Sequence, residues 1–155
     1  MATSPVVVPA SAKHVAHLTD RLRLADVQEV WNAYHFSPYQ ALAGAVHGSV
    51  VSWALELGRE PVAVWGVAPL GTWLSRRGSP WLLASDRLVE ASVFGAKVTR
   101  HYVLEMLRYF DRLENYVSNE NRLSIRWLRW GGFSIGAPEP WGIEGKMFRR
   151  FWKEA

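Results

Sequence analysis

Four side chains in this sequence have the chemistry to take a proton from an amine. Glu56 and Glu114 lie in segments with strand patterns, and His101 and Glu105 are about one helical turn apart. A carboxylate or an imidazole acts as a general base when it reaches the proton directly or through one water molecule. The same residues also fit a simpler interpretation, in which both glutamates point outward from strands and the other two form a pair on a helix surface.

Nucleophilic and metal chemistry have little support in the sequence. The chain has no cysteine, which excludes thiolate catalysis and disulfide bonds. His14 and His17 are close enough along a helix to share a metal ion, but no third ligand lies near them in the sequence. We therefore predict no metal site.

The segment from Asn121 to Phe133 has the clearest local structure of the chain. Asn121 can cap a helix by accepting a hydrogen bond from a backbone N–H group of the first turn. The residues that follow place apolar and basic side chains at helical spacing, and Gly131 and Gly132 supply a stop. The segment therefore predicts a cap, a short helix, a double-glycine stop and a strand.

This segment resembles the helix-to-strand segment of the GNAT acetyltransferase superfamily. The matching positions are Asn121, Ser124, Ile125, Arg126, Gly132 and Phe133. The resemblance implies that Asn121 lies near the pantetheine arm of acyl-CoA. In that family a tyrosine seven residues after the asparagine often protonates the leaving thiolate, and this chain has Leu128 at that position.

The order of the predicted elements along the chain is also that of the GNAT fold. Strands are predicted at residues 6–8, 51–57, 61–67, 81–84, 113–117, 133–136 and 145–152. Helices are predicted at residues 11–22, 26–34, 37–48, 86–110 and 121–130. For 155 residues, 49% of them apolar, we expect a single α/β (α+β) domain over residues 1–155, with a central mixed sheet of six to seven strands flanked by about four helices.

The resemblance further implies a place for acetyl-CoA. Its arm would lie between the fourth and fifth strands, with Leu83, Ser85 and Asn121 as the residues that bind it. Proteins of this family hold the pyrophosphate at a helix N-terminus, on a loop that contains glycine. Here the residues after the fourth strand include Asp86 and Glu90 and no glycine before position 95. The sequence therefore lacks a clear phosphate-binding loop.

Further motifs resemble a group of tailed-phage proteins, the podophage internal virion proteins and their acetyltransferase-like relatives. These motifs lie at residues 78–83, 113–115, 124–130 and 140–145, with Phe148 and Phe151. The resemblance implies a phage-encoded GNAT-fold protein that is associated with the virion or its assembly, with catalysis degenerate or lost. It implies a phage or host protein as partner, and a location in the host cytoplasm and the virion. The alternative is an active acyl-CoA-dependent N-acetyltransferase that modifies a host or phage amine.

The charge distribution suggests a second alternative, a nucleic-acid-binding accessory protein. The net charge is +4, and basic residues gather in the last quarter of the chain around Arg122, Arg126, Arg129 and Arg149. Arginine neutralises phosphates, and an exposed tryptophan stacks on bases. On the helical periodicity, however, the tryptophans between these arginines face inward.

The sequence predicts neither a membrane span nor export. The longest uncharged apolar run, at residues 41–55, falls short of the roughly 18–20 residues needed to cross a bilayer. The first residues lack the basic and apolar regions of a signal peptide.

Overall fold

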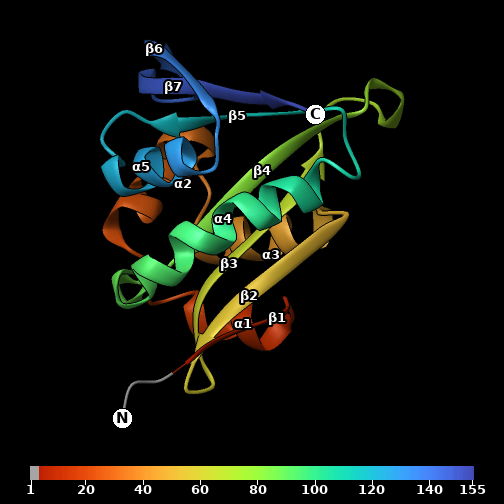
Figure 1. Cartoon of the computed structure of the whole chain (residues 1–155). Helices are drawn as coiled ribbons and strands as arrows, with labels where there is room; N and C mark the ends of the chain where they lie inside the picture. The colour runs from red at the N-terminus through yellow and green to blue at the C-terminus, as the bar shows by residue number, and fades with distance from the viewer. Residues whose placement is uncertain (1–3) are drawn as a thin grey trace.

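The computed structural model describes residues 4–155, apart from the side chains of Trp73, Val93 and Ala96, and contains a seven-stranded mixed sheet (Figure 1). The prediction that the first residues form no signal peptide falls partly on residues 1–3, which lie outside this range. The strands are β1 (Pro5–Pro9), β2 (Val51–Leu57), β3 (Glu60–Pro69), β4 (Arg77–Ala84), β5 (Arg112–Ser118), β6 (Ser134–Trp141) and β7 (Lys146–Glu154). Their order is β1-β2-β3-β4-β5-β7-β6, and β4 and β5 run parallel, whereas the other neighbours are antiparallel. The predicted mixed sheet is confirmed.

Five α-helices and two 3-10 turns connect these strands, where the sequence predicted about four helices. They are α1 (Ala12–Leu18), α2 (Leu24–Tyr34), α3 (Pro38–Gly48), η1 (Trp73–Ser75), η2 (Asp86–Ala91), α4 (Ser92–Met106) and α5 (Arg122–Trp130). None of the helices in residues 4–155 combines the length and the apolar character needed to cross a membrane.

Helix starts are the local features that the sequence predicts best. Ser37 caps α3 with a capping box. Its hydroxyl oxygen accepts a hydrogen bond from the backbone N–H of Gln40, and its own backbone N–H donates to the side-chain oxygen of Gln40. Asn121 caps α5 by accepting from the N–H of Ser124 at 3.4 Å. Both helices therefore begin where the sequence places them.

Two predicted helices are shorter in the structure. The helix expected at residues 11–22 ends at Leu18, and Leu22 instead forms a bridge with Ser85 at the end of β4. The helix expected at residues 86–110 is divided into η2 and α4. Ser85 caps η2 through the N–H of Arg87, and this tighter turn buries Leu88.

The last hairpin is longer than the sequence predicted. β6 continues through Pro138 and Pro140, which were expected to form a turn. These prolines are tolerated because β6 is an edge strand, and a bulge lies between Ile135 and Pro138. Among the aromatic residues of the helices, Trp127 is buried as predicted, whereas Trp130 is 37% exposed.

The helices cover both faces of the sheet. In Figure 1, α4 lies in front of β3 and β4, and α3 lies behind them. Adjacent residues of a strand point to opposite faces. Accordingly, Ala54 packs with α1 and α3, whereas Leu55 belongs to the core on the side of η2 and α5. The sheet is therefore buried on both sides around β3 and β4, which places the parting of β4 and β5 inside the molecule.

Candidate functional site

The parallel strands β4 and β5 separate soon after they meet. They pair only at Arg77 with Arg112 and at Gly78 with Leu113, and then fan apart (Figure 1). Beyond the last pair, the side-chain amide of Asn115 donates a hydrogen bond to the carbonyl oxygen of Pro80, at 2.8 Å. Beyond these two pairs, a gap takes the place of the hydrogen-bond ladder between β4 and β5, the fourth and fifth strands of the sheet.

A cavity of about 360 Å³ occupies this gap. Its walls are mainly apolar and come from every strand except β1 and from every α-helix except α1. Leu83 and Val117 line it from the two separated strands, and Trp127 and Leu128 line it from α5. A volume of this size is at the lower end of the range for small-molecule sites.

Aromatic side chains form one wall of the cavity. Tyr116 of β5 stacks on Trp141 of β6 with ring centroids 4.3 Å apart, and Tyr34 of α2 meets Trp141 edge-on at 5.8 Å. Three elements that are distant in sequence therefore build one aromatic surface. Such a surface suits the apolar part of a ligand.

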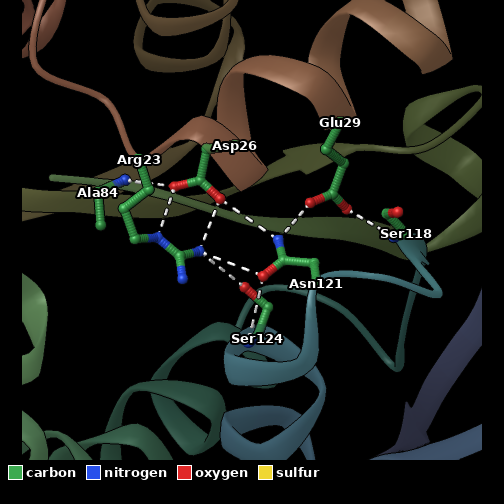
Figure 2. A network of polar contacts seen from close by, with 7 residues as sticks. All are labelled: Arg23, Asp26, Glu29, Ala84, Ser118, Asn121 and Ser124. Atoms are coloured by element: carbon green, nitrogen blue, oxygen red, sulfur yellow. Dashed lines mark hydrogen bonds and ion pairs between the residues drawn. The ribbon is translucent and has the colours of Figure 1, made fainter. Parts of the chain in front are cut away.

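A buried polar network connects α2 to the ends of both separated strands (Figure 2). Asp26 accepts hydrogen bonds from the backbone N–H of Ala84 at 2.9 Å and from two nitrogens of Arg23 at 2.7 and 3.2 Å. Glu29 accepts from the backbone N–H of Ser118 at 2.9 Å. Asn121 donates to both carboxylates, so that it joins the two halves of the network.

The network replaces the hydrogen bonds that the parting of the strands removes. Buried backbone N–H groups need a partner, and Ala84 and Ser118 lie at the last positions of β4 and β5. The carboxylates of Asp26 and Glu29 supply that partner. Arg23 also donates to Ser124 of α5, at 3.2 Å. The network therefore links the two separated strands across the gap, and it provides hydrogen-bond acceptors for the backbone N–H groups at their ends.

Burial raises the pKa of both acids in the network. The pKa of Glu29 is raised to about 7, because burial outweighs the hydrogen bond from Asn121 and because Asp26 is nearby. The pKa of Asp26 is also raised by burial, against the opposing effect of Arg23. Since Glu29 also lines the cavity, it is a carboxyl group that can gain or lose a proton near neutral pH at the wall of an apolar site.

The three residues predicted to bind acyl-CoA lie around the gap, in different roles. Leu83 lines the cavity. Ser85 is buried, caps η2 and lies next to Ala84, which the network engages. Asn121 is 3% exposed, and both its amide oxygen and its amide nitrogen are used inside the protein. Asn121 therefore positions the walls of the gap, and its binding to a ligand stays a prediction.

The proton-transfer candidates from the sequence lie elsewhere. Glu56 and Glu114 are each 8% exposed, so the expectation that they point into solvent is wrong. Glu56 is paired with His14 at 2.7 Å, and Glu114 with Arg77 and Arg150 at 2.9 and 2.8 Å. These partners give both carboxylates hydrogen bonds at positions that are largely shielded from solvent. The other two candidates, His101 and Glu105, lie on α4. Glu105 forms a surface ion pair with Arg108 at 3.2 Å.

The network itself was missed from the sequence. Arg23, Asp26 and Glu29 are three residues apart, which puts them on one face of a helix. That spacing is a usable signal, but only the fold brings this face against Asn121. The pairing therefore could not be read from α2 alone.

The start of α4 has no glycine loop open to a phosphate. Gly95 is in its first turns, and a Cβ added there would lie 2.1 Å from a ring carbon of Trp127. This glycine lets α4 and α5 approach closely, so its packing role explains its presence. Before it, Arg87 is engaged by Glu60 and Glu90, each at 2.8 Å.

No protein-family model matches the sequence, and no curated protein does. Solved structures do match the whole fold. The structure of yncA from Salmonella typhimurium, described with its cofactor acetyl-CoA, has a TM-score of 0.71 at 13% identity, over 97% of this chain and 93% of its own. The IAA acetyltransferase from Bacillus cereus has a TM-score of 0.63 at 18% identity, over 98% and 100%.

Another match is a GNAT-family acetyltransferase from Streptococcus pneumoniae, with a TM-score of 0.65 at 11% identity, over 97% of this chain and 99% of its own. Identities this low establish the fold alone. The order of the strands, the parting of β4 and β5 and these matches agree with one another. The chain therefore has a GNAT-like α/β fold, with a single seven-stranded mixed sheet.

Proposed function

We propose that this protein is an N-acyltransferase that moves an acyl group from acyl-CoA to a primary amine. The observation that carries the proposal is the apolar cavity between β4 and β5, with the carboxyl group of Glu29 on its wall and a pKa of about 7. Support also comes from structural neighbours that are described with acetyl-CoA, or with CoA and spermine. The phage origin and virion role expected from the sequence have no counterpart among these neighbours.

The cavity fits the acyl-pantetheine arm of such a donor. The indole nitrogen of Trp127 is buried and has no hydrogen-bond partner within the described part of the chain, and its side chain lines the cavity. A buried N–H group without a partner is costly, so it favours a ligand that brings a carbonyl oxygen. Leu83, Trp127 and Leu128 would hold the arm between the strands.

The protein offers fewer favourable contacts to the nucleotide end of acyl-CoA. The turn before α4 carries Asp86 and Glu90, which repel phosphates, and Arg87 is already paired with Glu60 and Glu90. The first turn of α4 contains no acidic residue, so its backbone N–H groups remain the electropositive feature there. We therefore expect most of the binding free energy to come from the arm.

Glu29 would act as the general base. When bound, acyl-CoA supplies a thioester that an amine can attack. The amine nitrogen bonds to the acyl carbon as the bond from that carbon to sulfur breaks, so that CoA leaves as a thiolate, which takes a proton from solvent. The carboxylate of Glu29 takes the proton that the amine nitrogen loses, while Asn121 and the N–H of Ser118 hold the carboxylate in place. A group with a pKa near the working pH is suited to this task. The surface of Tyr34, Tyr116 and Trp141 would take the apolar part of the amine.

The proposal is tested by acetyl-CoA-dependent thiol release with a panel of aliphatic and aromatic amines. We expect the rate to rise with pH to a plateau above about 7, and Glu29→Gln to lower kcat about 100-fold or more. Glu120→Gln removes an exposed charge and is the matched control. No thiol release with any amine, or an unchanged pH profile in Glu29→Gln, would overturn the assignment.

A second variant pair tests the cavity. Gly44 lines it, and a Cβ added at this position of α3 would have open space around it, with no neighbouring atom within 4 Å. Gly44→Leu should therefore fold and obstruct the cavity, with a large rise in KM for the amine. Gly48→Leu is the control, because Gly48 has equal space on the same helix and is not among the cavity residues.

A non-catalytic role in virion assembly is the second candidate. It is favoured by Leu128 at the position of the usual acid, and by exposed aromatic side chains on α2, α3 and their connection: Trp31, Tyr34, Phe36 and Tyr39 are 43–59% exposed. Clustered exposed aromatic residues often mark a protein interface. This candidate requires that Trp31→Ala reduces co-sedimentation with purified phage particles. Absence of co-sedimentation for the unmodified protein would contradict it.

A further inference from the structure

A second pocket lies on the outer face of α5, and arginines surround it. Its lining consists of Asn119, Arg122, Ile125, Arg126, Arg129 and Arg149, with a volume of about 360 Å³. No carboxylate is among these residues. The buried residue Ile125 is the one apolar residue of this lining.

This pocket is separate from the cavity between β4 and β5. Ser124, Trp127 and Leu128 line that cavity, whereas Arg122 and Arg126 line the arginine pocket. At about 100° per residue, these two sets lie on opposite sides of α5. The arginine pocket therefore does not belong to the site proposed for acyl-CoA.

The arginines of this pocket differ from most others in the chain. Eight arginines elsewhere have a carboxylate within 4 Å: Arg21, Arg23, Arg76, Arg77, Arg87, Arg108, Arg112 and Arg150. The ion pairs found in residues 4–155 include none for Arg122, Arg126, Arg129 or Arg149. A fold that neutralises most of its arginines thus leaves a group of four without an acid.

The placement of these charges is unfavourable for α5 alone. Arg122 lies in the first turn, where the helix dipole disfavours a positive charge, and that turn contains no acidic residue. Arg122 and Arg126 are four residues apart, a spacing at which like charges repel. A bound anion would offset both effects.

Arg149 of β7 is held in position for such a ligand. Its Nε donates to the side-chain oxygen of Asn119 at 2.7 Å, and its Nη1 donates to the carbonyl oxygen of Gly136 at 3.4 Å. Both contacts leave donors of the guanidinium group unused, because an arginine has five N–H donors. Arg149 therefore faces the three arginines of α5 from a second element.

We propose that the arginine pocket binds phosphate groups. Guanidinium groups match phosphate oxygens with paired N–H donors, and several around one pocket suit a group of charge near −2. The phosphates can come from a small nucleotide or from a nucleic-acid strand. The row of Arg122, Arg126 and Arg129 follows the helix for about two turns, which a strand can contact at successive phosphates.

Two probes test this and separate the sources. Inorganic pyrophosphate is titrated calorimetrically, and a fluorescent single-stranded oligonucleotide is followed by anisotropy at several salt concentrations. We expect Arg126→Ala and Arg129→Ala each to weaken binding about tenfold, and the dependence of log K on log salt to become shallower by about 0.7 for each lost phosphate contact. Arg100→Ala, an exposed arginine of α4 outside the pocket, is the control and should change binding little.

The outcomes are distinct. Binding of pyrophosphate that the pocket variants weaken assigns the site to small phosphates. Binding of the oligonucleotide alone, with the same variant pattern, assigns it to a strand. Binding of neither probe, or an equal loss in Arg100→Ala, would overturn the proposal. Circular dichroism of the exposed variants confirms that each is folded.

Discussion

The raised pKa of Glu29 predicts a pH-dependent stability difference between the protein and Glu29→Gln. The pKa is about 7 in the folded protein and 4.5 in the unfolded chain. Between these values the unfolded chain has released the proton while the folded protein retains it, so the stability of the folded state falls as pH rises. Below 4.5 the effect is absent, and above 7 it is complete. The full effect amounts to about 3 kcal/mol.

Glutamine carries no ionisable group, so Glu29→Gln removes this contribution at every pH. The free energy of unfolding of both proteins is measured by urea denaturation from pH 5 to pH 8. Histidine titrations are common to both and cancel in the difference. We expect the variant to gain about 2.5 kcal/mol relative to the unmodified protein across this interval, because part of the full effect lies below pH 5. A difference that does not change with pH would refute the idea that Glu29 is held with a raised pKa.

Three further variants test individual contacts. Asn121→Ala removes the cap of α5 and the link between two acids, and should lower the free energy of unfolding by about 1–3 kcal/mol in urea denaturation. Gly95→Ala forces a Cβ into Trp127 and should cost about 1–3 kcal/mol in the same measurement. Trp141→Ala removes the partner of Tyr116 on the cavity wall and should raise KM for apolar amines at least severalfold in the thiol-release assay.

The sequence predicts this fold well where a local signal and the global topology agree. Ser37 and Asn121 are caps that act within their own helices, and both helices start as expected. Prediction fails where a distant element decides. Leu22 leaves the helical path because it meets Ser85. Pro138 stays in a strand because β6 is the edge strand of the sheet formed by residues 4–155.

The candidate site is harder to predict because its polar side chains form hydrogen bonds with one another. Asn121 matches a family position that implies ligand contact, yet in this chain Asp26, Glu29 and Arg23 surround it. Its sequence neighbours give no indication of that. The acid that lines the cavity lies on α2, far from the segment with the recognisable pattern. Its raised pKa arises from burial, which the sequence of α2 does not report.

The most direct test of the central claim is calorimetric titration of acetyl-CoA into the purified protein, with Trp127→Phe alongside. Phenylalanine keeps an apolar ring in the cavity and removes the indole N–H, which has no partner within residues 4–155. The account predicts saturable micromolar binding that the variant weakens by about five- to tenfold, the effect of one hydrogen bond. Absence of saturable heat up to millimolar acetyl-CoA would contradict it.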